Sequence, residues 1–164
     1  DKIAALQDLP LEWHFIGPIQ SNKTRLIAEN FAWVHSVDRL KIAERLSAQR
    51  PLNLPPLQIC LQVNISDEAS KSGVASGEAG ALALQLARLP NLTLRGLMAV
   101  PAASDDVAEQ RAAFAKLRKL RDELNQHGLQ LDTLSMGMSH DFPAAIAEGA
   151  TILRIGSAIF GNRN

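Results

Sequence analysis

The sequence has 164 residues, 46% hydrophobic and 21% charged, and its 17 lysines and arginines balance 17 aspartates and glutamates. This composition indicates a soluble globular domain large enough to bury a core, and the zero net charge argues against a nucleic-acid or membrane-surface binder. The single cysteine, Cys60, excludes a disulfide within the sequence and a cysteine-based metal cluster. We therefore expect a cytoplasmic protein that binds no metal.

Strands and helices are predicted to alternate along the chain. Apolar residues at positions 3, 6 and 9 predict a short helix that Pro10 ends. After it, periodicity and turn residues predict, in order, a strand at 13–17, a helix at 23–30, a strand at 33–37, a helix at 39–50, a strand at 57–64, a helix at 75–89, a strand at 94–100, a helix from about 106 to 126, a strand at 131–135, a short helix, a strand at 151–156 and a final helical turn. This order predicts an α/β fold with parallel strands in a single domain over residues 1–164.

Polar residues and glycines are placed to begin and end these helices. The predicted N-caps are Ser21 or Asn22 for the helix at 23–30, Asp38 for the helix at 39–50, and Asp105 or Asp106 for the long helix. Gly128 is the predicted C-terminal glycine of the long helix. Its basic stretch, 111–121, is predicted to be a solvated face with the ion pairs Arg118–Asp122 and Lys119–Glu123.

The strand at 57–64 distinguishes between two architectures. Its odd positions are apolar, whereas Gln58, Cys60, Gln62 and Asn64 occupy the even ones. Helices cover both faces of an open doubly wound sheet, so both should be apolar, whereas the inside of a barrel can be polar near its mouth. We favour a (β/α)8 TIM barrel, incomplete here with six of eight strands, over the alternative that Gln58 and Gln62 lie on an exposed or inter-domain surface.

The segment 135–161 carries the densest candidate chemistry. Two predicted strands end there in Gly137-Met138-Ser139 and Gly156-Ser157, and small residues with free backbone N–H groups at strand ends can hold a phosphate. The alternative is that the glycines form tight turns and the serines cap helices. Arg154 stands between apolar neighbours and needs a partner. That partner is either a ligand acceptor, which we favour, or an inward carboxylate such as Asp132.

Other polar residues near strand ends give weaker signals. Asn64 and Lys71 flank a polar loop that could face the barrel mouth, but local contacts of Asp67 and Lys71 in a solvated loop are the favoured interpretation. His14 could stack on or bond a ligand, yet both His14 and His35 are expected to be satisfied core histidines. No histidine spacing matches a metal-binding motif.

Five segments of the chain resemble the pyridoxal phosphate homeostasis protein family, the YggS/PROSC-like proteins, which are similar to the N-terminal barrel of alanine racemase. They are HFIGPIQSNK (14–23), VNISDEASKSG (63–73), LRGLMAVP (94–101), LSMGMSHD (134–141) and ILRIGSAIFG (152–161). The resemblance implies a barrel of fold type III that binds pyridoxal 5'-phosphate (PLP) at its C-terminal mouth. It also implies a non-catalytic role in PLP (vitamin B6) and amino-acid homeostasis.

The resemblance also implies roles for individual residues. It places the PLP phosphate on Ser139, Gly156 and Ser157, and Arg154 against the pyridine nitrogen. An arginine there disfavours the protonated ring that acts as an electron sink, which suits a carrier or a racemase-like site. Met98 and Asn64 are implied to line the ring pocket.

Two enzymatic alternatives remain beside the homeostasis role. An amino-acid racemase needs a second acid/base, commonly a tyrosine, and this sequence contains no tyrosine. An unrelated phosphate-sugar barrel enzyme needs carboxylates or lysines at the strand ends, where this chain offers Asn64, Met98, Ser135 and Arg154 instead.

The chain departs from the family at its N-terminal end. The family's Schiff-base lysine lies in the first barrel strand, and none of the six lysines, at 2, 23, 41, 71, 116 and 119, stands in that context. We therefore expect a chain that lacks the N-terminal part of the barrel and the covalent lysine. Unpaired edges near Trp13 and Gly156 predict that the fragment self-associates, whereas the full-length protein is expected to be a monomer. The expected partners are PLP and PLP-dependent apoenzymes, but neither nucleic acid nor membrane.

Overall fold

The computed structural model describes residues 1–66 and 68–161. The helices are α1 (Lys2–Ala5), the 3-10 turn η1 (Ser21–Lys23), α2 (Thr24–Asn30), α3 (Leu40–Gln49), α4 (Ser76–Leu86), α5 (Val107–Gln126), α6 (Phe142–Ala147) and α7 (Ser157–Phe160). The strands are β1 (His14–Phe15), β2 (Trp33–Val37), β3 (Leu57–Asn64), β4 (Val74–Ala75), β5 (Leu92–Met98), β6 (Thr133–Met138) and β7 (Ile152–Arg154). The predicted alternation of strands and helices is confirmed except at β4, an unpredicted strand that follows β3 with no helix between them.

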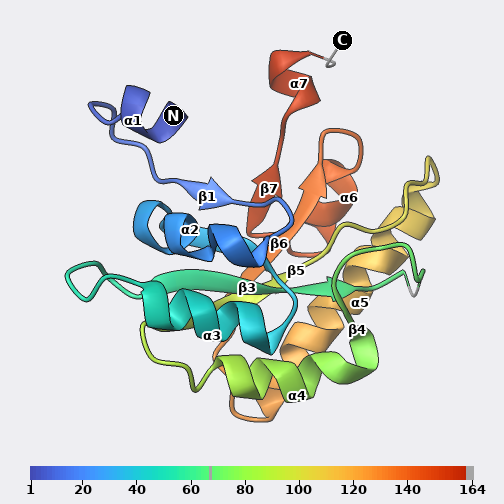
Figure 1. Cartoon of the computed structure of the whole chain (residues 1–164). Helices are drawn as coiled ribbons and strands as arrows, with labels where there is room; N and C mark the ends of the chain where they lie inside the picture. The colour runs from blue at the N-terminus through green and yellow to red at the C-terminus, as the bar shows by residue number, and fades with distance from the viewer. Residues whose placement is uncertain (67, 162–164) are drawn as a thin grey trace.

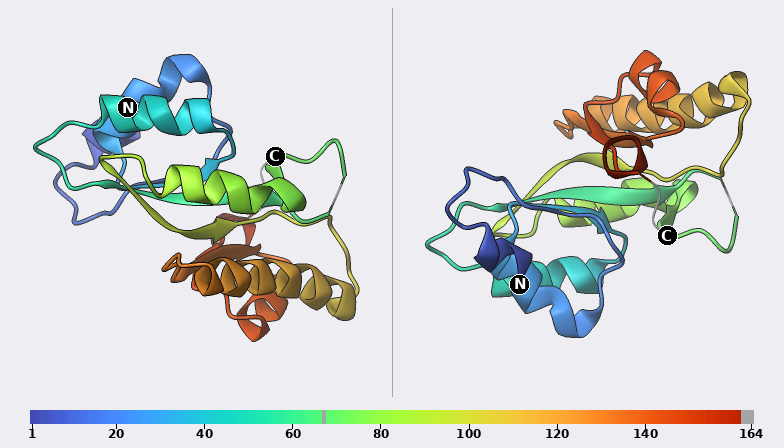
Figure 2. Two further views of the ribbon diagram at one scale, coloured as in Figure 1. Left: turned by 90° about the horizontal axis from the view of Figure 1, so that it is seen from below. Right: turned by 90° about the horizontal axis from the view of Figure 1, so that it is seen from above.

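The strands form one parallel sheet in the order β1-β2-β3-β5-β6-β7, with the two-residue β4 added beside β3. Figure 2 shows helices along the outside of these strands, with α3 and α4 on one side and α5 on the other. The sheet is curled, because a side chain of β2 bonds one of β6, although β3 and β5 lie between these strands. The structure is therefore a half-barrel, as predicted, with β1 and β7 at its edges (Figure 1).

The two faces of β3 separate two apolar clusters. Leu57, Ile59, Leu61 and Val63 belong to the large core between sheet and helices. Cys60 belongs to a small inner cluster with Trp33 and Met98, against which Ile152 packs. Leu153 joins the outer core instead. The outward facing predicted for the apolar positions of the strand at 57–64, and the inward facing of Cys60, are thus confirmed.

Several predicted boundaries are wrong by a few residues. Asp38 does not cap α3, because the chain is still extended at Arg39 (φ −146°, ψ 139°) and the helix begins one residue later. The segment with Ser21 and Asn22 forms a 3-10 turn, which puts Lys23 at the N-cap position of α2. Asp106 caps α5 as predicted and accepts from the amide of Ala108 at 2.8 Å. Gly128 follows α5 with a φ of +98°.

The ion pairs predicted along the basic face of α5 are also wrong. Arg118 pairs with Glu148 at 3.1 Å, and Arg111 pairs with the same carboxylate at 2.8 Å. Glu148 follows α6, so these bonds tie the end of α6 to α5. Among the described residues Lys119 and Glu123 form no ion pair.

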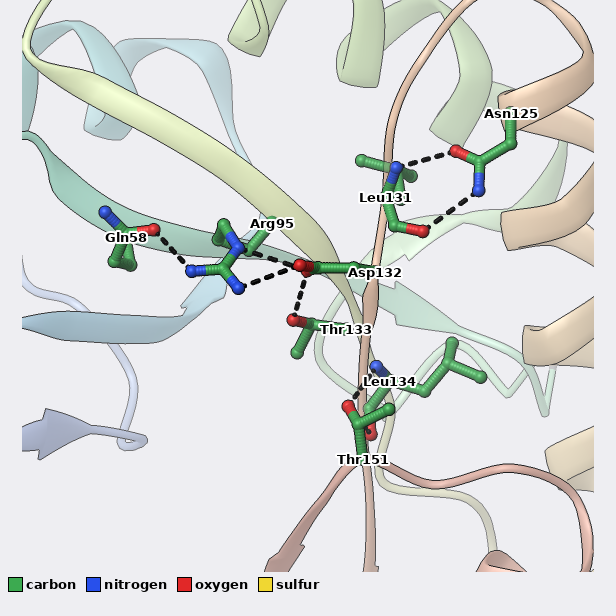
Figure 3. Close-up of polar contacts among 8 residues, drawn as sticks. All are labelled: Gln58, Arg95, Asn125, Leu131, Asp132, Thr133, Leu134 and Thr151. Atoms are coloured by element: carbon green, nitrogen blue, oxygen red, sulfur yellow. Dashed lines mark hydrogen bonds and ion pairs between the residues drawn. The ribbon is translucent and has the colours of Figure 1, made fainter.

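Three side-chain clamps hold the start of β6 (Figure 3). Asn125 exchanges two hydrogen bonds with the backbone of Leu131, at 2.7 and 2.9 Å. Arg95 forms a two-pronged bond to Asp132, and Thr151 bonds the backbone of Leu134. Since the clamps come from α5, β5 and the entry to β7, they fix where the inward side chains of β6 point.

Candidate functional site

Arg154 enters the half-barrel from β7, and no carboxylate among the described residues bonds to it. Its Nη1 atom donates to Oγ of Ser135 at 2.8 Å, and its Nη2 atom donates to the carbonyl of Ala99 at 3.0 Å. Asp132, the carboxylate proposed as an alternative partner, is bound by Arg95 at 2.8 Å. Burial lowers the pKa of Arg154. Among the described residues only neutral oxygens accept from this guanidinium, so it can still donate to an acceptor on a ligand.

Two histidines extend the polar network from Arg154 across the interior. Nδ1 of His35 lies 2.7 Å from Oγ of Ser135, and Nε2 of His35 lies 2.8 Å from Nδ1 of His14. Nε2 of His14 lies 3.0 Å from a carboxylate oxygen of Glu12. Burial lowers the pKa of His35 to about 4, and a positive charge on His14, when that ring is protonated, and the charge of Arg154 act in the same direction. His35 is therefore neutral at physiological pH and is a satisfied core histidine, as expected. His14 also has partners for both ring nitrogens, but it is only half-buried, so the expectation of a core residue is wrong for it.

The loops after β6 and β7 meet at the hydroxyl of Ser139. This oxygen accepts from the amide of Gly156 at 3.3 Å and from that of Ala158 at 3.1 Å. A Cβ added at Gly156 would meet no heavy atom within 4 Å, so the space beside this backbone is open. Ser157 is the exposed first residue of α7. The structure thus brings Ser139, Gly156 and Ser157 together, although Gly137 and Met138 belong to β6 and not to the loop.

Met98 and Asn64 lie at the carboxyl ends of β5 and β3. Met98 is buried and lines a cavity of about 350 Å³ together with Ile16, Gln62 and Lys71. Asn64 donates to the carbonyls of Glu68 and Lys71, at 2.8 and 3.5 Å, and so holds the loop after β3.

The loop after β3 combines features of both interpretations of its sequence. Lys71 faces the mouth by lining this cavity, whereas Asn64 makes the local contacts. The predicted local contact of Asp67 lies outside the described residues.

Sequence reasoning missed the connection between Arg154 and the histidines. The sequence marks Ser135 only as one of several strand-end residues, and it indicates no partner for His35. The available signal was alternation, since His35 stands two residues after the inward Trp33. The separation of 100 positions between His35 and Ser135 hid the contact.

The described residues contain neither a metal cluster nor a membrane-spanning helix. Within 1–66 and 68–161, no three histidine, cysteine, aspartate or glutamate side chains gather closely enough to hold a metal ion. In the same part of the chain, no helix has the length and apolar character needed to cross a membrane.

Comparison with known proteins gives matches along nearly the whole chain. A family model described as "Alanine racemase, N-terminal domain" matches residues 6–164. The pyridoxal phosphate homeostasis protein of Pseudomonas aeruginosa is 66% identical over 163 residues, which cover 99% of this chain and 70% of that protein.

Solved structures resemble this chain over the same extent. The structure of PipY from Synechococcus elongatus with PLP bound matches with a TM-score of 0.87 at 41% identity and covers 98% of this chain and 76% of PipY. Alanine racemase from Corynebacterium glutamicum matches with a TM-score of 0.73 at 17% identity, and this match covers 99% of the chain and 46% of the racemase. The racemase therefore supports the barrel fold alone.

Proposed function

The chain belongs to the pyridoxal phosphate homeostasis protein family, and on that premise we propose that it binds PLP at the mouth of the half-barrel. The proposed role is PLP and amino-acid homeostasis by a non-catalytic binding protein. PipY, 41% identical to this chain, has a structure with PLP bound. Residues 1–164 would form a single domain, the C-terminal portion of a PLP-binding barrel.

The partly buried guanidinium of Arg154 is the observation that carries this proposal. A cation in a protein interior requires acceptors, and here it has only the hydroxyl of Ser135 and the carbonyl of Ala99 among the described residues. The unprotonated pyridine nitrogen of PLP is an uncharged acceptor, and the guanidinium can donate a hydrogen bond to it. A carboxylate at the same place would hold a proton on the ring nitrogen instead.

The junction of the loops after β6 and β7 fits the phosphate. The amides of Gly156 and Ala158 already converge on one oxygen, that of Ser139. A phosphate oxygen is a stronger acceptor than a neutral hydroxyl, because bonds to charged acceptors are stronger. Ser139 and Ser157 can add hydroxyl donors, and the open space beside Gly156 leaves room for the group. Met98 would line the ring pocket, and Asn64 would shape its edge through the loop it holds.

The chemistry that PLP supplies when bound is an aldehyde that reacts with amines. The residues of this chain would contribute binding and orientation. Arg154 donates a hydrogen bond without supplying a removable proton, because its guanidinium stays charged. A ring nitrogen without a proton stabilises carbanions poorly, which supports a carrier over a catalyst. PLP-dependent apoenzymes are the proposed recipients.

A titration of the chain with PLP, followed by the absorbance of the cofactor, tests the proposal. The unmodified chain is expected to bind PLP more tightly than pyridoxal, which lacks the phosphate. Arg154→Met is expected to weaken binding by about tenfold or more, because it removes a buried charged donor. Arg25→Met, at an exposed arginine of α2, is the matched control and should leave binding unchanged. Absence of PLP binding by the unmodified chain would refute the proposal, and the loaded chain should not racemise L-alanine.

A further inference from the structure

The hydrogen bonds that join Arg154, Ser135 and His35 inside the half-barrel can run in only one direction from donor to acceptor. A guanidinium can only donate, so Oγ of Ser135 accepts from Arg154. The hydroxyl hydrogen of Ser135 then needs an acceptor, because this side chain is fully buried. Among the described residues, its other side-chain neighbour is Nδ1 of His35, at 2.7 Å. Nδ1 of His35 is therefore the acceptor.

The direction set at Ser135 continues through both imidazoles to the surface. A neutral His35 that accepts at Nδ1 carries its hydrogen on Nε2 and donates it to Nδ1 of His14, 2.8 Å away. His14 then carries its hydrogen on Nε2 and donates it to the carboxylate of Glu12 at 3.0 Å. The side chain of Glu12 is 64% exposed, so the chain of bonds ends in solvent. The ring of Trp33, stacked on His14 at 5.4 Å, holds the plane of that imidazole.

We propose that His35 and His14 are positioning residues for Arg154: as neutral Nε2–H tautomers they orient the Ser135 hydroxyl as an acceptor and so fix the guanidinium that faces the ligand. The ligand end of this inference rests on the proposed function, whereas the direction of the bonds does not. The carboxylate of Glu12 accepts the last hydrogen bond of this series, at its solvent-exposed end. Loss of His35 would leave the Ser135 hydroxyl without its acceptor and free to rotate.

The groups around His35 keep its imidazole neutral, so that Nδ1 remains an acceptor for Ser135. Among the described residues, the titratable groups that act on it are His14 from β1 and Arg154 from β7, while Asp141, before α6, and Cys60 of β3 act on Arg154. Burial raises the pKa of the Cys60 thiol to about 12, so it stays neutral. A proton on Nδ1 of His35 would reverse its bond to Ser135 and place a second cation beside the guanidinium. Both effects oppose protonation.

Nitrogen-15 NMR of the histidine rings tests the direction of the bonds without any ligand. At pH 7 both His14 and His35 should show the nitrogen shifts of neutral Nε2–H tautomers. Ser135→Ala should move the Nδ1 resonance of His35, because it removes the donor. An Nδ1–H tautomer or an imidazolium at His35 in the unmodified chain would overturn the proposal. This measurement stands even if PLP does not bind, so it separates a failure here from a failure of the proposed function.

Two substitutions at His35 test the effect on the ligand site. His35→Leu, which removes the acceptor, is expected to weaken PLP binding by about tenfold. His35→Asn keeps an acceptor oxygen for Ser135 and should restore binding to within about threefold of the unmodified chain. His127→Asn, at an exposed histidine after α5, is the control. Equal PLP affinity of His35→Leu and the unmodified chain would overturn the positioning role.

Discussion

Gly96 in β5 is a point where two strands approach too closely for any side chain. A Cβ added there would overlap the carbonyl oxygen of Thr133 in β6, and it would lie 2.6 Å from the carbonyl carbon and 2.9 Å from Cα of that residue. All three atoms belong to backbone, so no side-chain rotation relieves the clash. Gly96→Ala therefore requires β5 and β6 to separate.

The cost of that separation follows from the neighbouring contacts. Inserting one methyl group into a packed interior costs about 1–3 kcal/mol. Weakening one adjacent bond between the strands, such as that from the amide of Asp132 to the carbonyl of Arg95 at 2.9 Å, adds about 1 kcal/mol. We expect Gly96→Ala to lower the free energy of unfolding by about 3 kcal/mol, and the melting temperature by roughly 6–12 °C.

Gly77 in α4 provides the matched control with the opposite sign. A Cβ there would meet no heavy atom within 4 Å, and alanine favours a helix over glycine by about 1 kcal/mol. Urea denaturation followed by circular dichroism should show Gly77→Ala more stable than the parent chain and Gly96→Ala less stable. A Gly96→Ala chain as stable as the parent would refute the reasoning, because the two strands could then not be as close as described.

Three further outcomes are expected. Gly156→Ala should leave the melting temperature within about 2 °C of the parent, since its Cβ meets open space, but weaken PLP binding by roughly tenfold in the absorbance titration. The contribution of neutral His35 to the free energy of unfolding should be complete above pH 6.5 and should decline as the pH falls toward 4, because the unfolded chain binds the proton more readily than the folded chain does. The free energy of unfolding of His35→Asn should lack this decline. The bonds from Arg111 and Arg118 lower the pKa of Glu148, so denaturation midpoints should fall as acid protonates it below its ordinary value of 4.5, and Glu148→Gln should flatten that decline. Identical pH profiles for the parent and either variant would contradict the corresponding assignment.

Local patterns in the sequence were sufficient for the order of the elements apart from the two-residue β4, and for the facing of the strand at 57–64. Alternation along 57–64 predicted both the outer core and the inward Cys60, because side chains on a strand point to opposite faces in turn. The small residues at Ser139 and Gly156 marked the loops that the structure brings together. Helix starts were less predictable, since the extended conformation of Arg39, not the presence of Asp38, decides where α3 begins.

The partner of Arg154 was decided by tertiary structure alone. The sequence required a partner for a cation among apolar neighbours and favoured a ligand acceptor, but it left Asp132 open as the alternative. The structure assigns Asp132 to Arg95, and the clamps on β6 turn Ser135 toward Arg154 and His35. These contacts depend on the curl of the sheet, which brings β2 and β6 together across two intervening strands. A local pattern specifies which face a residue occupies, whereas the curvature and register of the sheet determine what it meets there.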